Sequence, residues 1–205
     1  MPAKPFLLYL GLWAAFGAVH SVMAGSGFKA RWRQLLGRLA PAERLIYNLI
    51  ALLTLSLVMA VGHAILPHDP VFNPQGPALW GVQGVQLAGL GMLVYAVSHY
   101  DLALFAGLKQ IIYARRGETP PVEPLRTSAL HHYVRHPIYA ACLPVIWARP
   151  MDTATLAANL FATAYFLIGM RLEENRLLTL YGEDYADYRK RVPALIPFLP
   201  MGERA

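Results

Sequence analysis

The feature that most constrains how this chain can fold is a set of three stretches, each about 20 residues long, without a charged side chain. They are residues 5–24, 45–66 and 78–98. A helix of about 20 apolar residues spans the hydrocarbon core of a bilayer and satisfies its own backbone hydrogen bonds there. We therefore expect an all-α integral membrane protein in which each stretch forms a transmembrane helix.

The composition agrees with a membrane location. Hydrophobic residues make up 56% of the 205 residues and charged residues 15%, whereas a soluble domain usually carries about 25% charged residues. The net charge of +6 lies between the apolar stretches, as juxtamembrane charge does, and not on one soluble face that could bind nucleic acid. A single cysteine, Cys142, excludes an internal disulfide. The first apolar stretch is longer than the core of a typical signal peptide, so we expect it to be retained.

The rest of the chain predicts shorter elements. Residues 28–44 are basic and contain Trp32, which favours a short interfacial helix. Residues 137–148 are apolar but short for a full crossing, 149–152 read as a turn, and 153–170 run back. The interval 137–170 is therefore interpreted as a helical hairpin. Three spans and this hairpin give about five transmembrane helices, followed by a charged, cytoplasmic C-terminal helical segment.

The third span contains small residues at helical spacing, namely Gly84, Ala88 and Gly91. Small residues allow the backbone of a neighbouring helix to come close. We therefore expect another helix to pack on this face.

The charges between the spans orient the molecule. The segments after the first and third spans carry five Lys or Arg residues each, and the segment after the second carries none. The positive-inside rule places the first and third connections and the C-terminal tail in the cytoplasm. We expect residues 1–98 to form a membrane scaffold with a basic cytoplasmic loop, and residues 99–205 to form the catalytic region of one integrated domain.

Two polar clusters flank the predicted hairpin, Arg135-His136-Pro137-Ile138-Tyr139 before it and Glu173-Glu174 after it. Proline can begin a helix, and a helix N-terminus with adjacent cations suits a carboxylate or another anion. Acidic residues beside a span are costly to bury and usually mark function. Snorkelling cations and glutamates neutralised by neighbouring arginines are the structural alternative. Taken together, the clusters predict one two-part site on the cytoplasmic side.

Two histidines at the ends of spans are candidates for proton transfer. His20 lies near the cytoplasmic end of the first span and His99 ends the third. An intramembrane histidine is a functional candidate by default, and a helix-to-helix hydrogen bond is the alternative. The adjacent His131 and His132 would point apart on a helix, and no metal site is predicted.

Tyr181, Tyr185 and Tyr188 recur at i, i+4 and i+7 before the basic residues 189–191. This pattern is typical of an amphipathic interfacial helix with an aromatic belt. The functional alternative is a lid over the cytoplasmic mouth of the site.

These motifs together resemble the isoprenylcysteine carboxyl methyltransferase and phospholipid methyltransferase superfamily over about residues 125–198. The matching residues are Arg135 to Tyr139, Glu173-Glu174, residues 181–189 and Val192-Pro193. Two further motifs are similar to the bacterial methanethiol S-methyltransferase group, namely residues 20–24 with Phe28-Lys29, and Asp101-Leu102 with residues 107–110.

The resemblance implies an all-α membrane methyltransferase of the bacterial inner membrane that uses S-adenosylmethionine, without a Rossmann domain, on the cytoplasmic side. Its partners would be the lipid bilayer and a small-molecule or lipidic methyl acceptor, with no nucleic acid. The implied cofactor-binding residues are His136, Pro137, Tyr139, Glu173, Glu174, Tyr185, Tyr188 and Arg189. The candidates for catalysis are His20, His99, Arg135 and Glu174.

Specific roles follow as hypotheses. Arg135 and His136 hold the carboxylate end of the cofactor, and Glu173 or Glu174 faces it. A thiol acceptor must lose a proton, and His20 or His99 is the plausible base.

The sequence departs from the family at several positions. Ala129 and Ala141 stand where the family usually has glycine, Leu130 where it often has proline, and His132 where it often has arginine. Glycine permits close backbone approach. The sequence therefore does not determine the shape of the pocket at these positions.

The expected function is S-methylation of a small, methanethiol-like thiol. The alternatives are methylation of an isoprenylcysteine carboxylate or a phospholipid amine, and a non-enzymatic membrane protein of the same fold linked to nitrogen-oxide metabolism.

Overall fold

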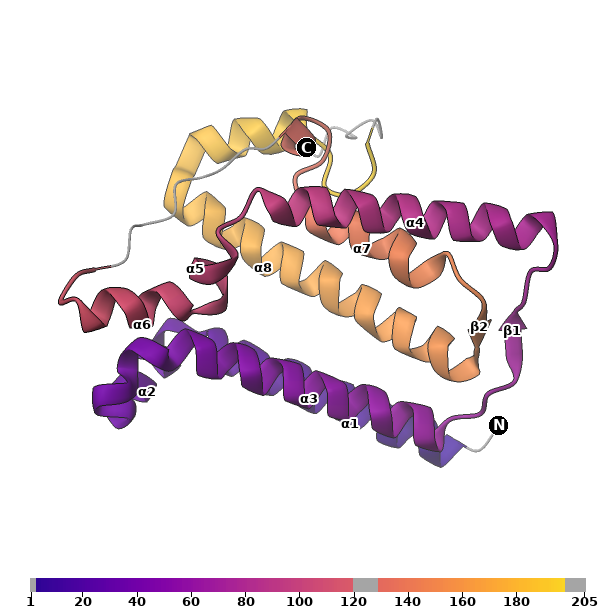
Figure 1. The fold of residues 1–205 in the computed structure, drawn as a ribbon, viewed down its shortest axis with the longest axis horizontal. Helices are drawn as coiled ribbons and strands as arrows, with labels where there is room; N and C mark the ends of the chain where they lie inside the picture. The colour runs from indigo at the N-terminus through magenta and orange to yellow at the C-terminus, as the bar shows by residue number, and fades with distance from the viewer. Residues whose placement is uncertain (1–2, 120–128, 198–205) are drawn as a thin grey trace. The chain divides into compact units, whose positions relative to one another are not determined.

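The computed structural model describes residues 3–119 and 129–197, apart from the side chain of Ser26. The two ends of the stretch 125–198, over which the resemblance runs, lie outside the described residues. Within these residues the chain is helical apart from two short strands, so the predicted all-α fold is confirmed (Figure 1). In chain order the elements are α1 (Ala3–Ala24), α2 (Ser26–Leu36), η1 (Gly37–Ala42), α3 (Glu43–Ile65), β1 (Pro70–Phe72), α4 (Pro77–Ser98), α5 (Leu102–Ala106), α6 (Leu108–Arg115), η2 (Ala129–His132), α7 (Pro137–Trp147), β2 (Met151–Asp152) and α8 (Thr153–Arg191).

The predicted apolar spans correspond to α1, α3 and α4. In the described residues, four helical stretches are long and apolar enough to cross a bilayer, namely Ala3–Ala24, Gly27–Ile65, Pro77–Ser98 and Thr153–Arg191. Large apolar side chains point outward from them, such as Leu53 at 68% exposure and Trp80 at 72%, and such surfaces need an apolar surrounding. The chain is an integral membrane protein, and the count of about five spans stays a prediction.

The fold divides into two compact units, each described by itself. The first contains α1, α2, η1, α3, α5, α6 and residues 153–158 of α8. The second contains β1, α4, η2, α7, β2 and α8 from Asn159 onward. The functional division predicted at residue 98 stays a prediction.

In the first unit α1 packs along α3 (Figure 1). Tyr9 is only 1% exposed, and a Cβ added at Gly62 of α3 would lie 2.3 Å from Cε2 of its ring. A glycine at this position therefore lets the two helices approach closely. Trp13 and Phe16 continue the buried aromatic face of α1 in an edge-to-face pair, with ring centroids 5.8 Å apart.

The basic segment 28–44, which predicted a short interfacial helix, contains α2 and the 3-10 helix η1. The break lies at Gly37, whose φ of 51° is a left-handed conformation that favours glycine. Glu43, 5% exposed at the start of α3, pairs with Arg33 of α2. This ion pair fixes the basic segment to the beginning of α3.

The corner from α5 to α6 explains the motif at residues 101–110. Asp101 caps α5 by accepting a hydrogen bond from the N–H of Leu104 at 3.0 Å, and it also pairs with Lys109. Gly107 has a φ of 98°, and a Cβ there would lie 2.5 Å from the backbone nitrogen of Leu45. This motif is therefore a structural corner that holds α5 against α3.

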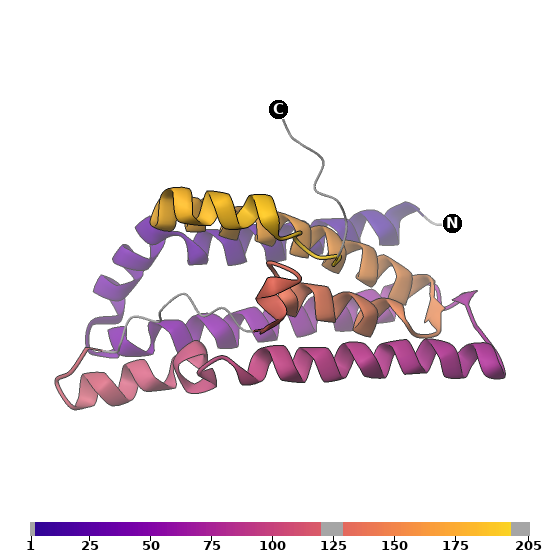
Figure 2. The ribbon, with the colours of Figure 1, turned by 90° about the horizontal axis from the view of Figure 1, so that it is seen from above.

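In the second unit α4 and α7 lie side by side (Figures 1 and 2). A Cβ added at Gly89 would lie 2.7 Å from Cγ of Pro144 and 3.3 Å from the carbonyl oxygen of Ala141. The prediction that a helix approaches α4 was right, but the position was wrong, because nothing lies within 4 Å of a Cβ added at Gly84 or Gly91. The contact follows the face of Gly89.

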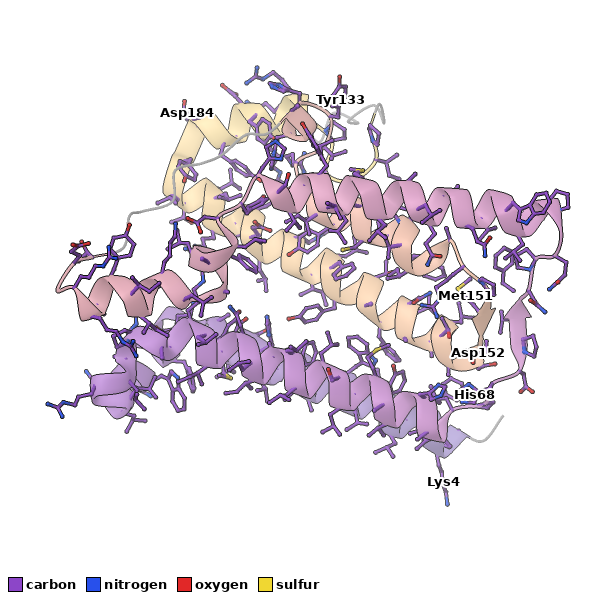
Figure 3. The ribbon with its side chains drawn as sticks, viewed as in Figure 1. Lys4, His68, Tyr133, Met151, Asp152 and Asp184 are labelled. Carbon is purple, nitrogen blue, oxygen red and sulfur yellow. The ribbon has the colours of Figure 1, made fainter. Side chains whose placement is uncertain are left out.

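The predicted hairpin is formed by α7 and α8. The expected turn at 149–152 contains a strand that the prediction missed, since Met151 and Asp152 form β2 and pair antiparallel with β1 (Figure 3). The helices are joined by hydrogen bonds from Trp147 Nε1 to Thr163 Oγ1 at 3.0 Å and from Asn159 Nδ2 to the carbonyl of Ile146 at 2.7 Å. These bonds orient α8 on α7.

Helix α8 extends well past the predicted end of the hairpin at residue 170 and reaches Arg191. Gly182 interrupts it with a φ of 55° and a ψ of −129°, and the last part of the helix takes a new direction (Figures 1 and 2). The predicted C-terminal helical segment is thus the part of α8 that follows this kink.

Candidate functional site

Arg135 and His136 lie in the short connection between η2 and α7. His136 is the N-cap of α7, and Pro137 begins the helix where a missing N–H costs nothing. The backbone N–H groups of Arg135 and His136 donate to the carbonyl oxygens of Pro193 at 2.8 Å and Ala194 at 3.1 Å. The residues after α8 therefore lie directly against this connection.

The carboxylate of Glu174 on α8 contacts three basic side chains. Its Oε1 accepts from Nε of Arg135 at 2.8 Å and lies 2.6 Å from Nη2 of the same side chain. The same oxygen lies 3.1 Å from Nε2 of His136, and Oε2 lies 3.4 Å from Nε of Arg189. The two parts of the predicted site, before α7 and within α8, do come together. We refer to Arg135, His136, Glu173, Glu174 and Arg189 as the Glu174 cluster.

The cluster is largely buried. The side chains of Arg135, His136 and Glu174 are 6%, 4% and 8% exposed. Burying charges is costly unless each one is paired and hydrogen-bonded, as these are. The three side chains therefore hold one another in a fixed arrangement.

Arg135 also connects the two ends of the hairpin. Its Nη1 donates to the carbonyl oxygen of Arg189 at 3.0 Å and to that of Val192. The guanidinium is thus directed at groups of the protein itself. This geometry suits Arg135 to positioning Glu174. It suits the predicted contact between Arg135 and a cofactor carboxylate less well.

The neighbouring Glu173 has a different environment. Its side chain is 50% exposed, and its Oε2 lies 3.6 Å from Nδ1 of His136. Adjacent residues on a helix point about 100° apart. The side chain of Glu174 is therefore buried while that of Glu173 is half exposed. Glu173 is the exposed carboxylate of the cluster.

The pKa values of the two histidines at this end of the second unit are shifted in opposite directions. Burial lowers the pKa of His136, but its hydrogen bonds to Glu173 and Glu174 and their negative charges outweigh burial, so the net pKa is raised. Burial and the charge of His136 lower the pKa of His131. The cluster therefore favours a protonated imidazole at His136 beside a neutral one at His131.

Tyr139 extends the site into the apolar region. Its ring centroid lies 5.6 Å from that of His136, and the ring stacks on Phe166 of α8 at 5.5 Å. Ala141, where the family usually has glycine, is fully buried, and its carbonyl faces Gly89 of α4. Ala129, the other such position, is exposed in η2. The Ala141 methyl group is thus part of the core of the second unit.

Two tyrosines after the kink interact with residues at this end of the second unit. Tyr188 donates its hydroxyl to the carbonyl of His131 at 2.8 Å. Tyr185 is 3% exposed, interacts electrostatically with Glu174 and Arg135, and its hydroxyl has no hydrogen-bond partner among the described residues. A buried hydroxyl without a partner is unusual, and a polar group of a ligand could form a hydrogen bond with it.

The two candidate bases lie in different units. His20 belongs to the first unit, where its Nε2 forms a hydrogen bond with the hydroxyl of Tyr47 of α3. His99 is the C-cap of α4 in the second unit, and its Nδ1 donates to the carbonyl of Tyr95 at 2.8 Å.

Two contributors to the site were missed from the sequence. The carbonyl groups of residues 192–194 bind the Arg135–His136 connection, and Phe166 supports Tyr139. A backbone carbonyl is present in every residue, so the residue types do not show which carbonyls accept these hydrogen bonds. Phe166 stands four residues before the predicted end of the hairpin and looks like any apolar residue of a span.

The arrangement suits a ligand that carries both signs of charge. It offers a half-exposed carboxylate, an aromatic ring and a buried hydroxyl beside a buried ion-pair network, all in the second unit. The fixed charges around Glu174 need no reorganisation when such a ligand binds.

Comparison with known proteins identifies relatives along nearly the whole chain. The chain is 35% identical over 207 residues to a methanethiol S-methyltransferase of Crocosphaera subtropica, which covers 94% of this chain and 75% of that protein. It is 36% identical over 202 residues to methanethiol S-methyltransferase 2 of Bradyrhizobium diazoefficiens, covering 96% of this chain and 74% of the relative.

A more distant relative is the protein-S-isoprenylcysteine O-methyltransferase of Rattus norvegicus, 26% identical over 129 residues, or 60% of this chain and 45% of that one. No family model matches the chain, and no solved structure matches it. The superfamily resemblance of the sequence motifs is confirmed. The chain is a membrane methyltransferase and belongs to the methanethiol S-methyltransferase family.

Proposed function

We propose that the protein transfers a methyl group from S-adenosylmethionine to the sulfur of a small thiol, with the Glu174 cluster as the cofactor site. The observation that carries the proposal is the convergence of Arg135, His136 and Glu174 within 3.1 Å. The names of the relatives at 35–36% identity support a thiol as the acceptor.

The residues of the second unit fit the chemical groups of this cofactor. S-adenosylmethionine combines a cationic sulfur, an amino-acid end, ribose hydroxyls and an aromatic base. Glu173 has an open carboxylate, the Tyr139 ring offers a stacking face, and the buried hydroxyl of Tyr185 is without a partner among the described residues. Each of these groups matches one of the cofactor's features.

The cofactor, when bound, supplies a methyl group on a positively charged sulfur. Glu173 would accept hydrogen bonds from its hydroxyl or ammonium groups, and the buried Glu174, paired with Arg135 and His136, would hold these side chains in place around it. His136 and Arg135 keep Glu174 ionised and oriented, and Arg189, 3.4 Å from Glu174, completes the pairing. Pro137, Tyr139 and Tyr188 would lie around the cofactor. The protein's contribution to an in-line methyl transfer is then alignment and exclusion of water.

The acceptor must lose its proton before or during transfer, because a free thiol has a pKa of about 8.5. We propose His20 as the base, with His99 as the alternative. His20 lies among apolar side chains of α1 and α3, such as Val19, Met23 and Ile50. His99 holds its Nδ1 proton on the carbonyl of Tyr95, so its proposed base would be Nε2.

The proposed site faces the cytoplasm of a bacterial inner membrane. The support is the distribution of basic residues, which concentrate in the segments after α1 and α4. The cytoplasm is also where a soluble cofactor of this kind is made.

A labelled-methyl assay with the purified protein in detergent tests the proposal. Three acceptors are offered separately, namely methanethiol, an isoprenylcysteine carboxylate and a phospholipid amine. We expect label in methanethiol, as dimethyl sulfide, and loss of that label in the Glu173→Gln/Glu174→Gln double variant. Label found only in a lipidic acceptor would refute the thiol assignment, and no label with any acceptor would refute the activity.

The base is tested separately. His20→Ala is expected to lower thiol methylation by about 10²-fold or more, the usual contribution of general base catalysis, while its affinity for S-adenosylmethionine stays at the wild-type value. Unchanged turnover would remove His20 from the mechanism and leave His99→Ala as the next variant.

A further inference from the structure

The basic segment 28–44, which joins α1 to α3, contains cations in two different environments. Three of its five Lys and Arg residues contact other groups of the first unit. Arg33 forms the ion pair with the start of α3. The ammonium of Lys29 lies 6.0 Å from the centre of the Tyr47 ring. The guanidinium of Arg44 lies 5.5 Å from the centre of the Phe105 ring. These three charges therefore hold the segment on its own unit.

Arg31 of α2 and Arg38 of η1 differ from these three. Both residues are exposed, and neither forms an ion pair or a side-chain hydrogen bond with any residue that the structure describes. A guanidinium matches the geometry of a phosphate group, to which it can donate two parallel hydrogen bonds. These two side chains therefore offer positive charge to an anionic group outside the protein.

Apolar side chains lie close in sequence to the two arginines. In α2, Phe28, Trp32 and Leu35 recur at i, i+4 and i+7 and share one face of the helix. The rings of Phe28 and Trp32 stack with their centroids 5.8 Å apart, and Leu35 is 80% exposed. Leu39 follows Arg38 in η1 and is 63% exposed. We call Arg31, Trp32, Leu35, Arg38 and Leu39 the α2 surface.

The α2 surface lies at the end of two spans. Helix α1 ends at Ala24, α2 begins at Ser26, and η1 ends at Ala42 directly before α3 (Figure 1). Both α1 and α3 belong to stretches that are long and apolar enough to cross a bilayer, so the segment between them lies at one face of the membrane. A helix with both cations and exposed apolar side chains suits this boundary between headgroups and acyl chains.

We propose that the α2 surface binds anionic phospholipids, with Arg31 and Arg38 at the phosphate and Leu35 and Leu39 among the first carbons of the acyl chains. The inference goes beyond the proposed function. It concerns the surface of the first unit alone and requires neither a methyl donor nor a methyl acceptor.

The combination of charge and exposed apolar surface favours a lipid over other anions. A free phosphate would gain nothing from Leu35 and Leu39, whereas an acyl chain removes them from water. Each basic residue near an anionic membrane surface contributes about fivefold to binding. Two arginines that have no ion pair among the described residues can therefore distinguish an anionic from a zwitterionic lipid.

Native mass spectrometry of the purified protein in detergent tests this proposal. The protein is titrated separately with phosphatidylglycerol and with phosphatidylcholine of the same acyl chains. We expect the wild type to prefer phosphatidylglycerol by about tenfold or more, given about fivefold for each arginine. Arg31→Gln/Arg38→Gln should lose most of this preference through weaker binding of phosphatidylglycerol alone.

The matched control is Arg115→Gln/Arg116→Gln, which removes the same charge from two exposed residues at the end of α6 in the same unit. We expect this variant to keep the wild-type preference. All variants replace exposed side chains, so the midpoint of thermal unfolding should stay at the wild-type value.

Leu35→Ser/Leu39→Ser tests the apolar part of the surface. Because both lipids carry the same acyl chains, this variant should bind both more weakly and keep the preference between them. Electron spin resonance of spin-labelled lipids in vesicles that contain the protein repeats the comparison in a bilayer. There the wild-type preference should shrink between about 0.1 M and 1 M salt, since the Debye length falls from about 10 Å to 3 Å.

Three results would overturn the proposal. Equal wild-type affinity for the two lipids would leave the α2 surface to another occupant, such as an acidic protein. An equal loss of preference in the Arg115→Gln/Arg116→Gln control would assign the effect to overall charge. Unchanged affinities in Leu35→Ser/Leu39→Ser would exclude contact with the acyl chains. The proposed function stands or falls separately, because methyl transfer is not measured in any of these experiments.

Discussion

The two units of the molecule hold their polar side chains in opposite ways. In the second unit, Glu174 is buried with Arg135 and His136 as a network of charges at the ends of helices. In the first unit, His20 and Tyr47 form a hydrogen bond between an imidazole and a hydroxyl, within two apolar helices. Burying an unpaired charge costs far more than burying a neutral polar group. Removal of a partner from the Glu174 cluster should therefore cost more stability than removal of the His20–Tyr47 hydrogen bond, although the first unit also buries Glu43 against Arg33.

The largest expected effect follows from this difference. Glu174→Ala leaves Arg135 and His136 buried without their common partner, so we expect a loss of about 3–5 kcal/mol in the free energy of unfolding. Denaturant unfolding in detergent micelles measures it. His20→Ala in the first unit should cost clearly less.

Glu173→Gln is the matched control within the cluster, because its side chain is half exposed. We expect a change of about 1 kcal/mol or less, as for exposed ion pairs. Equal losses for Glu173→Gln and Glu174→Ala would show that the buried network is not what stabilises the second unit.

A smaller effect tests the helix contacts that frame each unit. Gly89→Ala places a methyl group 2.7 Å from the Pro144 ring, and overpacking of this kind costs about 1–3 kcal/mol. Gly62→Ala makes the equivalent change in the first unit, against Tyr9. The midpoints of thermal unfolding of both variants show how well the α4–α7 and α1–α3 contacts tolerate an added methyl group.

Gly84→Ala is the control on the same helix, because nothing lies within 4 Å of its added Cβ. We expect neutral or slightly raised stability, since alanine is the better helix former. A loss at Gly84 as large as at Gly89 would mean that α4 packs on a different face.

The smallest effect is the pH dependence of the second unit. The pKa of His136 is raised above its ordinary value of about 6.5. Its stabilising contribution is therefore complete below about pH 6.5 and is lost as pH rises through the raised value of the folded state. The midpoint of thermal unfolding should fall over that range.

The matched comparison for this pH effect is His136→Gln against His132→Gln, an exposed neighbour. The decrease in the midpoint should become flatter in His136→Gln and persist in His132→Gln. The same slope in both variants would assign the pH dependence to another group.

The parts of the fold that were predicted correctly have a local cause. A run of apolar residues such as 45–66 predicts α3 because a charge-free stretch of that length has few other stable forms in a bilayer. The meeting of Arg135 with Glu174 was predictable because both flank one apolar hairpin. A helical segment after the hairpin was also predicted, from the spacing of its tyrosines, but not that it would continue the helix of the span as far as Arg191, because the charged residues between them carry no apolar signal.

The parts that were missed depend on the contact between two elements. Gly89, rather than Gly84 or Gly91, faces α7. The side of α4 that packs there lies against Pro144 and Ala141, and the sequence of α4 alone does not reveal this contact. Tyr47 meets His20 because α1 and α3 pack in one register. The strand pair β1–β2 joins residues about 80 positions apart, which no local pattern encodes.

The central claim is that the Glu174 cluster binds S-adenosylmethionine, and calorimetric titration of the purified protein with this cofactor tests it most directly. Saturable binding by the wild type is expected to weaken by about tenfold or more in Glu173→Gln, since a charge-assisted hydrogen bond contributes about 1.5–3 kcal/mol. Wild-type affinity in both Glu173→Gln and Glu174→Gln would contradict the claim.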